Sequence, residues 1–157
     1  GDLGRMAEFA EANHEKVGHI YGNHGASWYV ATRYGISILG AWDECITPAY
    51  LEDCDMAYRM DLAGVPRVTV QGCSSIHGWA KDGTDGSRGS NTVNINPETA
   101  LQNSRTHDLN FQYYFRKWGG LNGQEKFKHP FNNPNLPLDY WKFDPHLRAK
   151  QQWKLPA

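Results

Sequence analysis

The stretch PAYLEDCDMAYRMDLAGVPRVTVQ, residues 48–71, decides the fold class because it has the pattern of a helix, a tight turn and a strand. A helix is expected over residues 49–63, and Gly64 followed by Pro66 is a common signal for its end. Residues 67–71 alternate as a strand does. The apolar stripe expected on the helix consists of Leu51, Cys54, Ala57 or Tyr58, and Leu62. Helix, turn and strand in succession predict an α/β fold.

Further elements are expected on the N-terminal side of this stretch. Residues 3–13 have the three-to-four spacing of a helix, with Asp2 as its N-cap. Residues 17–21 and 27–32 have the apolar or alternating patterns of strands, with glycine-containing turn residues between them. Residues 33–39 are expected to form a short helix that leads into the central stretch.

The C-terminal side begins with a long loop at residues 73–91, rich in glycine, serine and threonine. Residues 97–118 are expected to form a long helix that a glycine pair ends, with Asn96 as N-cap. Its buried face is expected to include Leu101, Leu109, Tyr113 and Trp118. Residues 121–139 are rich in proline and asparagine and should wrap over the surface, and a short helix is expected near residues 144–152.

The length of 157 residues fits a single domain over residues 1–157. In this reading residues 1–96 hold the sheet and the acidic helix, and residues 97–157 hold the C-terminal helices and the wrap. The net charge of -1 argues against nucleic acid or an anionic membrane as a partner. No apolar run is long enough for a transmembrane helix. The six Trp and eight Tyr suit a core, and they also suit carbohydrate faces.

The three cysteines, Cys45, Cys54 and Cys73, are an odd number without short paired spacing. This usage favours reduced thiols and predicts a cytoplasmic protein. A zinc site that combines Cys73 and His77 with the other two cysteines is a weaker alternative, because structural zinc usually draws on tightly spaced ligand pairs.

Three carboxylates, Glu52, Asp53 and Asp55, stand where the central helix is expected to begin. A helix N-terminus favours negative charge because its first N–H groups are unpaired and its dipole is positive there. Three acids within four residues exceed what capping requires. At least one of them is therefore expected to serve chemistry, with a solvated capping cluster as the alternative.

The segments GAWDE (40–44), PAYLEDCD (48–55) and YRMDLAG (58–64) resemble the acceptor-side segment of family 2 glycosyltransferases with the GT-A fold. That family commonly shows G-x-F-D-E-x-F-x-P-x-Y-x-E-D-x-D-x-x-x-R-x-x-x-A-G, where this chain has Trp42 and Ile46 in place of the two Phe. A histidine after SI (75–77) and the run YYFRKWGG (113–120) add to the likeness, which covers roughly residues 26–132. It implies a partial GT-A-like, Rossmann-like mixed sheet with flanking helices and an extended C-terminal segment.

The resemblance implies that an inverting enzyme moves a sugar from a nucleotide-sugar donor to a glycan or other hydroxyl acceptor. Asp53 is then the general base that takes the proton of the attacking hydroxyl. A divalent metal, Mn or Mg, would face the nucleoside diphosphate, with His77 as its ligand. The loop after His77 could close over the donor. The residues implied in substrate binding are Trp42, Asp43, Glu52, Asp55 and Trp79, of which Glu52 and Asp55 orient the acceptor or adjust the basicity of the base.

The family's nucleotide-binding half, with its D-x-D metal motif, should precede these segments. GDLGRM (1–6) resembles the point just after that motif, so the chain is expected to be a truncated form that lacks most donor contacts. The alternative is a non-catalytic carbohydrate-binding or interaction domain of the same fold. A metal-dependent hydrolase that uses His77, His107 and the acids is a third, weaker hypothesis. Strand edges left open would favour pairing with another copy of the chain.

Overall fold

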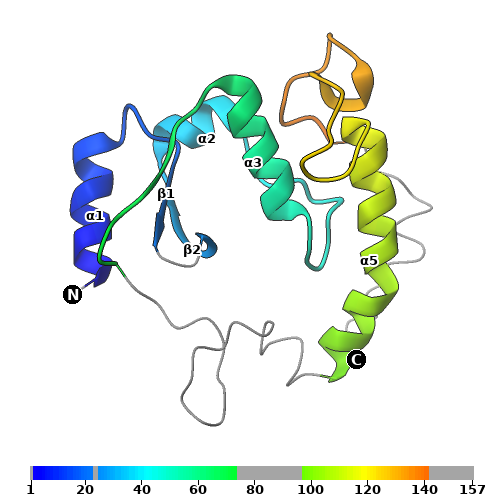
Figure 1. The fold of residues 1–157 in the computed structure, drawn as a ribbon, viewed down its shortest axis with the longest axis horizontal. Coiled ribbons are helices and arrows are strands. Elements are labelled where there is room, and N and C mark those ends of the chain that lie inside the picture. The colour runs from blue at the N-terminus through cyan, green and yellow to red at the C-terminus, as the bar shows by residue number, and fades with distance from the viewer. Residues whose placement is uncertain (1, 23–24, 74–96, 142–157) are drawn as a thin grey trace. The chain divides into compact units, whose positions relative to one another are not determined.

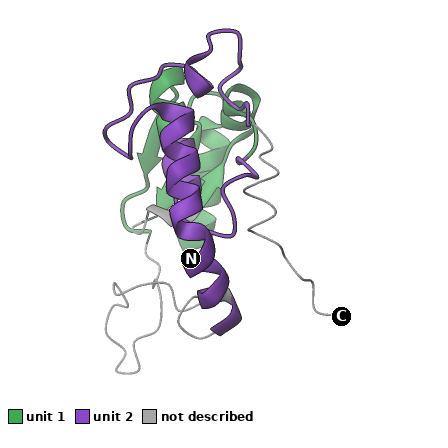
Figure 2. Cartoon of the chain, turned by 90° about the vertical axis from the view of Figure 1, so that its right-hand side faces the viewer, with its two compact units in different colours: residues 1–41, 57–95 green, residues 42–56, 96–157 purple. Residues whose placement is uncertain are grey.

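The computed structural model describes residues 2–22, 25–73 and 97–141 (Figure 1). Within these ranges the chain forms four α-helices, a small mixed sheet of three strands and one 3-10 turn, which confirms the predicted α/β class. The chain divides into two compact units (Figure 2). Unit 1 comprises Gly1–Ala41 and Ala57–Ile95, and unit 2 comprises Trp42–Met56 and Asn96–Ala157.

The sheet belongs to unit 1 and has the strand order β2-β1-β3. The central strand β1 (His19–Gly22) pairs antiparallel with β2 (Gly25–Ala31) and parallel with β3 (Arg67–Thr69). All three expected strands are confirmed, with small shifts at their ends. The pairing of β1 with β3 brings the central stretch of sequence beside a strand that lies far earlier in the chain.

An apolar cluster on one face of the sheet forms the core of unit 1. Helix α1 (Asp2–Asn13) packs against β1 and β2 and contributes Met6, which is fully buried (Figure 1). The cluster consists of Met6, Val17, Ile20 and Cys73, with Phe9, Ala10, Val30, Val68 and Val70 packed against it. The expectation of Asp2 as N-cap was wrong, because Asp2 is already helical and its carboxylate accepts a bond from Arg5 one turn later.

Helix α2 (Arg33–Leu39) follows the hairpin and begins at a capping threonine. The Oγ1 atom of Thr32 accepts a hydrogen bond from the amide of Gly35 at 3.0 Å and donates to the carbonyl of Val17 at 2.6 Å. The backbone of Gly35 approaches Gly18 so closely that an added Cβ would lie 2.5 Å from the carbonyl oxygen of Gly18. These contacts fix α2 against the residues that lead into β1.

Helix α3 (Glu52–Ala63) confirms the central helix but begins three residues later than residues 49–63 predict. Tyr50 and Leu51 have φ angles of 75° and 80°, in the left-handed region that a right-handed helix excludes. The helix ends as expected, at Gly64 with φ of 64°.

The buried side of α3 differs from the predicted apolar stripe. Leu51 is buried as expected, but the other predicted members are only partly buried. The buried residues inside the helix are Asp55, Met56, Arg59 and Met60. In unit 1 the Arg59 guanidinium donates to the carbonyls of Leu39 and Ala41. An apolar pattern fails here because two of the buried side chains are charged and are stabilised by specific partners.

Helix α5 (Pro97–Trp118) lies in unit 2 and confirms the long helix with the expected bounds. Its buried face was only half predicted, because Leu101 is 50% exposed whereas Tyr113 and Trp118 are buried. Most of the buried positions are polar and recur every three or four residues, as helix geometry requires for one face. This polar stripe consists of Asn103, Thr106, Asn110, Tyr113 and Lys117.

The chain turns back on itself immediately after α5. Gly119 has φ of 73°, and a Cβ added to Gly120 would lie 1.9 Å from the carbonyl oxygen of Gln124. The carbonyl of Trp118 accepts hydrogen bonds from the amides of Lys126 and Phe127 at 3.0 and 2.9 Å. This tight return holds the last turn of α5 in place.

The segment that follows consists of turns and irregular structure with a short 3-10 helix, η1 (Pro130–Asn132). Most of the loop predicted at residues 73–91, the N-cap Asn96 and the helix expected near residues 144–152 lie outside the described residues. None of the described helices combines the length and the apolar character that crossing a membrane requires.

Candidate functional site

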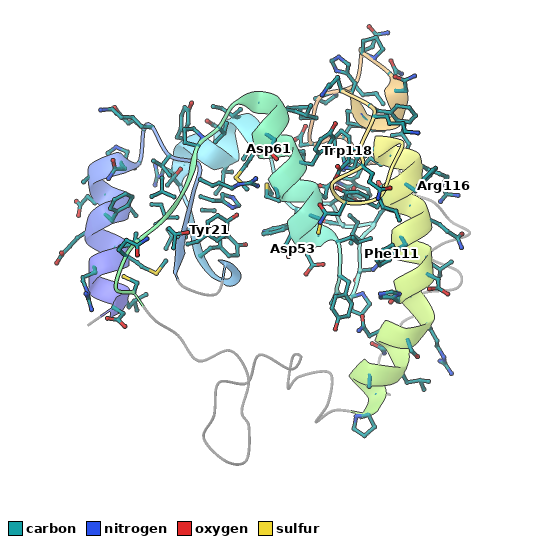
Figure 3. All side chains as sticks on the ribbon, in the orientation of Figure 1. Tyr21, Asp53, Asp61, Phe111, Arg116 and Trp118 are labelled. Atoms are coloured by element: carbon teal, nitrogen blue, oxygen red, sulfur yellow. The ribbon has the colours of Figure 1, made fainter. Side chains whose placement is uncertain are left out.

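The candidate site is the acid loop, Trp42–Met56, which belongs to unit 2 and contains the first turn of α3. Its carboxylates differ sharply in exposure. Asp43 and Asp55 are 3% and 0% exposed, whereas Asp53 is exposed at the helix start (Figure 3). Of the three aspartates of the loop, two thus lie in the interior and one can be reached by solvent, while Glu44 is exposed as well.

Lys117 of α5 bridges the two interior acids. Its Nζ atom lies 2.7 Å from Asp43 Oδ2 and 2.7 Å from Asp55 Oδ1, and all three side chains are at most 1% exposed. Charge-assisted hydrogen bonds of this length are strong, and the ammonium offsets the cost of burying the carboxylates. One side chain therefore fastens both ends of the acid loop to the last turn of α5.

Neutral donors complete the shell around the same two carboxylates. Asp43 accepts hydrogen bonds from the amide of Cys45 and the hydroxyl of Tyr113, both at 2.9 Å. Asp55 accepts a hydrogen bond from Trp118 Nε1 at 2.8 Å, and Figure 3 marks Trp118 at the end of α5. Donors from the protein therefore bind both carboxylates. Asp43 and Asp55 hold the loop in place, which is a different role from the substrate binding that the sequence predicted for them.

Asn110 holds the middle of the acid loop. This fully buried side chain donates through Nδ2 to the carbonyl of Ala49 at 2.9 Å and to that of Thr47 at 3.3 Å. The next residues along the chain are Tyr50 and Leu51, whose left-handed φ angles are uncommon for residues other than glycine. A left-handed conformation of this kind is kept only where surrounding contacts stabilise it, and the hydrogen bonds of the Asn110 amide are contacts of that kind.

Glu52 and Asp53 occupy the first turn of α3 in different environments. Asp53 Oδ1 accepts a hydrogen bond from the amide of Cys54 at 2.8 Å. The Oε2 atom of Glu52 is buried and, among the described residues, has no hydrogen-bond partner. Burial raises the pKa of Glu52, and backbone hydrogen bonds oppose this shift in part. Burial together with the charge of Asp53 raises the pKa of Cys54 to about 12, which makes that thiol a poor nucleophile.

Aromatic rings from the acid loop and α5 form a surface in the same unit. Tyr50 lies edge-on to His107 with 5.7 Å between ring centroids, and His107 lies 4.7 Å from Phe111. Farther along α5, Phe111 and Phe115 border an open hollow of about 410 Å³, to which Arg116 also contributes. Figure 3 marks Phe111 and Arg116 on this helix. Exposed aromatic faces beside polar groups suit ligands that have both apolar faces and hydroxyls.

Five of the predicted site residues belong to the acid loop: Trp42, which is partly buried, Asp43, Glu52, Asp53 and Asp55. The structure joins Asp43 and Asp55 through Lys117. His77 and Trp79 lie outside the described residues, so their predicted roles stay predictions. Within the described part of the chain, no three His, Cys, Asp or Glu side chains are grouped so that they could hold a metal ion. Among the described residues, which include all three cysteines, there is no disulfide.

Sequence reasoning missed the contribution of α5 to this site. Lys117, Tyr113 and Asn110 all contact the acid loop, yet only Tyr113 was expected to be buried, and then as part of an apolar face. The signal that could have revealed them is the spacing of the polar stripe, whose polar residues recur at helical intervals where an apolar face was expected.

No protein-family model, curated protein or solved structure matches the chain. The likeness to family 2 glycosyltransferases therefore rests on the sequence pattern alone, in residues 40–64, 75–77 and 113–120.

Proposed function

We propose that this chain is the acceptor-side, catalytic part of an inverting glycosyltransferase that moves a sugar from a nucleotide-sugar donor to a hydroxyl acceptor. One observation supports this most strongly. Asp53 is the exposed aspartate of a loop whose other two aspartates are held by Lys117. A general base must reach its substrate, and Asp53 is the aspartate of the loop that solvent reaches.

In the proposed reaction the acceptor oxygen attacks the anomeric carbon while the bond from that carbon to the nucleoside diphosphate breaks. The configuration at the carbon inverts, and the hydroxyl proton passes to the Asp53 carboxylate. Proton transfer to a positioned base typically contributes about 10²–10⁴-fold to the rate. In this proposal Glu52, the neighbour of Asp53 in the first turn of α3, helps to orient the acceptor.

The acceptor is a glycan in this proposal because the loop lies next to aromatic faces. Tyr50 belongs to the acid loop itself and stacks edge-on with His107. The ring of Phe111 extends this surface along α5. Aromatic faces complement the C–H faces of sugar rings, and polar tips can bind their hydroxyls.

A divalent metal, Mn or Mg, would neutralise charge on the departing diphosphate when bound. The described residues provide no donor set for it. By resemblance His77 would be a ligand, together with groups from the nucleotide-binding half that the family places earlier in the chain. None of the steps assigned to Asp53 and Glu52 depends on this ion.

The test is a transfer assay on the full-length product of the gene that encodes this chain. Nucleotide sugars are supplied in turn with simple glycan acceptors, and nucleoside diphosphate release is followed with the anomeric configuration of the product by proton NMR. The proposal predicts a product of inverted configuration. A product of retained configuration, or no transfer with any donor, would contradict it.

A second candidate, carbohydrate binding without catalysis, is favoured by the cluster of Tyr50, His107 and Phe111. NMR titration of the chain with glycans distinguishes the two. Binding that Tyr50→Ala weakens, without any nucleoside diphosphate release by the full-length protein, would support this candidate.

A further inference from the structure

Three members of the polar stripe of α5 bind the acid loop through their polar groups. Asn110 donates to loop carbonyls, Tyr113 donates to Asp43, and Lys117 bridges Asp43 and Asp55. Placing polar side chains in an interior costs desolvation, and well-packed apolar residues often stabilise a fold as well or better. A stripe of this composition therefore calls for a reason other than stability.

We infer that the polar stripe of α5 positions Glu52 and Asp53 for reaction, with Lys117 as the central positioning residue. Lys117 acts through Asp43 and Asp55, which lie at opposite ends of the acid loop. The catalytic part of this inference rests on the proposed function. The positioning of Glu52 and Asp53 by α5 is a property of the chain that can be tested without a substrate.

The acid loop is held on both sides of Asp53. Asp55 is bound through its carboxylate to Lys117 and Trp118, and its amide donates the first hydrogen bond of α3 to the carbonyl of Leu51 at 2.8 Å. Asp53 lies two residues before this anchor. On its other side the backbone passes through the left-handed pair Tyr50 and Leu51, which the Asn110 contacts stabilise.

The end of α5 that carries Lys117 and Trp118 is itself held in place. Trp118 receives two backbone hydrogen bonds from the returning chain, and the close approach of Gly120 to Gln124 leaves that return little freedom. Displacement of a reacting group by about 1 Å can cost roughly 10²-fold in rate, so a rigid support for Asp53 would have a direct kinetic value.

Two adjacent tyrosines provide a matched test. Tyr113 and Tyr114 are both buried on α5, and each donates its hydroxyl to a carboxylate. Tyr113 reaches Asp43 of the acid loop, whereas Tyr114 reaches Glu125 of the segment after α5. Tyr113→Phe and Tyr114→Phe thus remove the same group from neighbouring positions, and the first removes a hydrogen bond to the acid loop whereas the second removes one to the segment after α5.

The first readout needs no substrate and uses the chain itself. Tyr113→Phe is expected to speed hydrogen exchange at the Asp55 amide about tenfold, and Tyr114→Phe to leave it nearly unchanged. Carboxyl NMR should show the pKa of Glu52 moving down toward its usual range in Tyr113→Phe, because the loosened loop hydrates that carboxyl. Equal behaviour of the two variants would overturn the inference.

The second readout is transfer by the full-length protein. Tyr113→Phe and Trp118→Phe are expected to lower kcat about tenfold with the donor KM unchanged, and Tyr114→Phe to leave both unchanged. If Tyr113→Phe speeds hydrogen exchange at the Asp55 amide but leaves kcat unchanged, the catalytic part of the inference is overturned. Normal turnover by Asp53→Asn would instead contradict the proposed function. The hydrogen-exchange comparison of the two tyrosine variants would still test the positioning of the loop.

Discussion

The apolar cluster of unit 1 and the cluster around Lys117 in unit 2 have opposite chemistry. Unit 1 packs α1 onto one face of its sheet through an apolar cluster in which Met6 and Ile20 are fully buried. Unit 2 places two carboxylates, one ammonium and an amide between the acid loop and α5. Apolar burial is non-directional and tolerates small shifts, whereas hydrogen-bonded ions demand particular positions.

The difference indicates what each unit is for. An apolar interior supplies stability, roughly in proportion to the area removed from water. A buried ionic interior adds little net stability compared with apolar residues of similar volume, although removing one partner is costly. In this protein the buried ions include Asp55, two residues after Asp53, so we interpret unit 1 as the scaffold and unit 2 as the functional part.

The largest effect on stability is expected from Lys117→Met. The change leaves the Asp43 and Asp55 carboxylates buried without the ammonium between them and should cost about 3–5 kcal/mol of unfolding free energy. Urea denaturation followed by tryptophan fluorescence measures it. Lys128→Met, at an exposed lysine of the same unit, should change stability by less than about 0.5 kcal/mol. Similar values for the two variants would break the comparison between the units.

Met6→Ala tests the apolar side of the comparison. Deleting this fully buried side chain from the cluster on the sheet should cost about 2–5 kcal/mol, the range for truncating a core methionine to alanine. The same denaturation experiment applies, repeated across pH, because the loss should not depend on pH in the way that a charge defect does. Leu3→Ala in the same helix is the control, since Leu3 is 69% exposed. A loss for Met6→Ala no larger than this control would show that the cluster does not support unit 1.

The smallest effect is expected from Glu52→Gln. Because burial raises the pKa of Glu52, the folded state keeps this proton to a higher pH than the unfolded chain does. The stabilisation is complete below the usual value of 4.5 and is lost as the pH rises through the folded-state pKa. Glu52→Gln should therefore gain stability relative to the parent above that pH, by less than about 1 kcal/mol, in melting curves recorded from pH 4 to pH 8. A relative gain toward low pH would contradict the assignment.

The scaffold was largely predictable because its signals are local. Each of these signals lies within a few residues of the element that it defines. They are the spacing of apolar residues in 48–71, the glycine that ends the helix at Gly64, and the alternating patterns of the strands. The start of α3 was missed because Tyr50 and Leu51 adopt left-handed backbone, a choice that a residue 60 positions away helps to impose through its side-chain amide.

The ionic interior could not be predicted in the same way. Asp43 and Lys117 stand 74 residues apart, and the residue types of each favour exposure when they are considered alone. The acids of the site were found through the family resemblance and through their excess over capping needs. The division of the three aspartates into two interior residues and one exposed residue depends on tertiary partners, so the structure had to supply it.

The most direct test of the central claim compares Asp53→Asn with Asp61→Asn in the full-length protein. Both residues are exposed aspartates of α3, and Figure 3 marks both. Sugar transfer is measured for each variant under the conditions that the parent protein requires. Asp53→Asn should lower turnover by about 10²–10⁴-fold with the fold intact, and Asp61→Asn should leave it near the parent value. Near-normal turnover for Asp53→Asn would contradict the account.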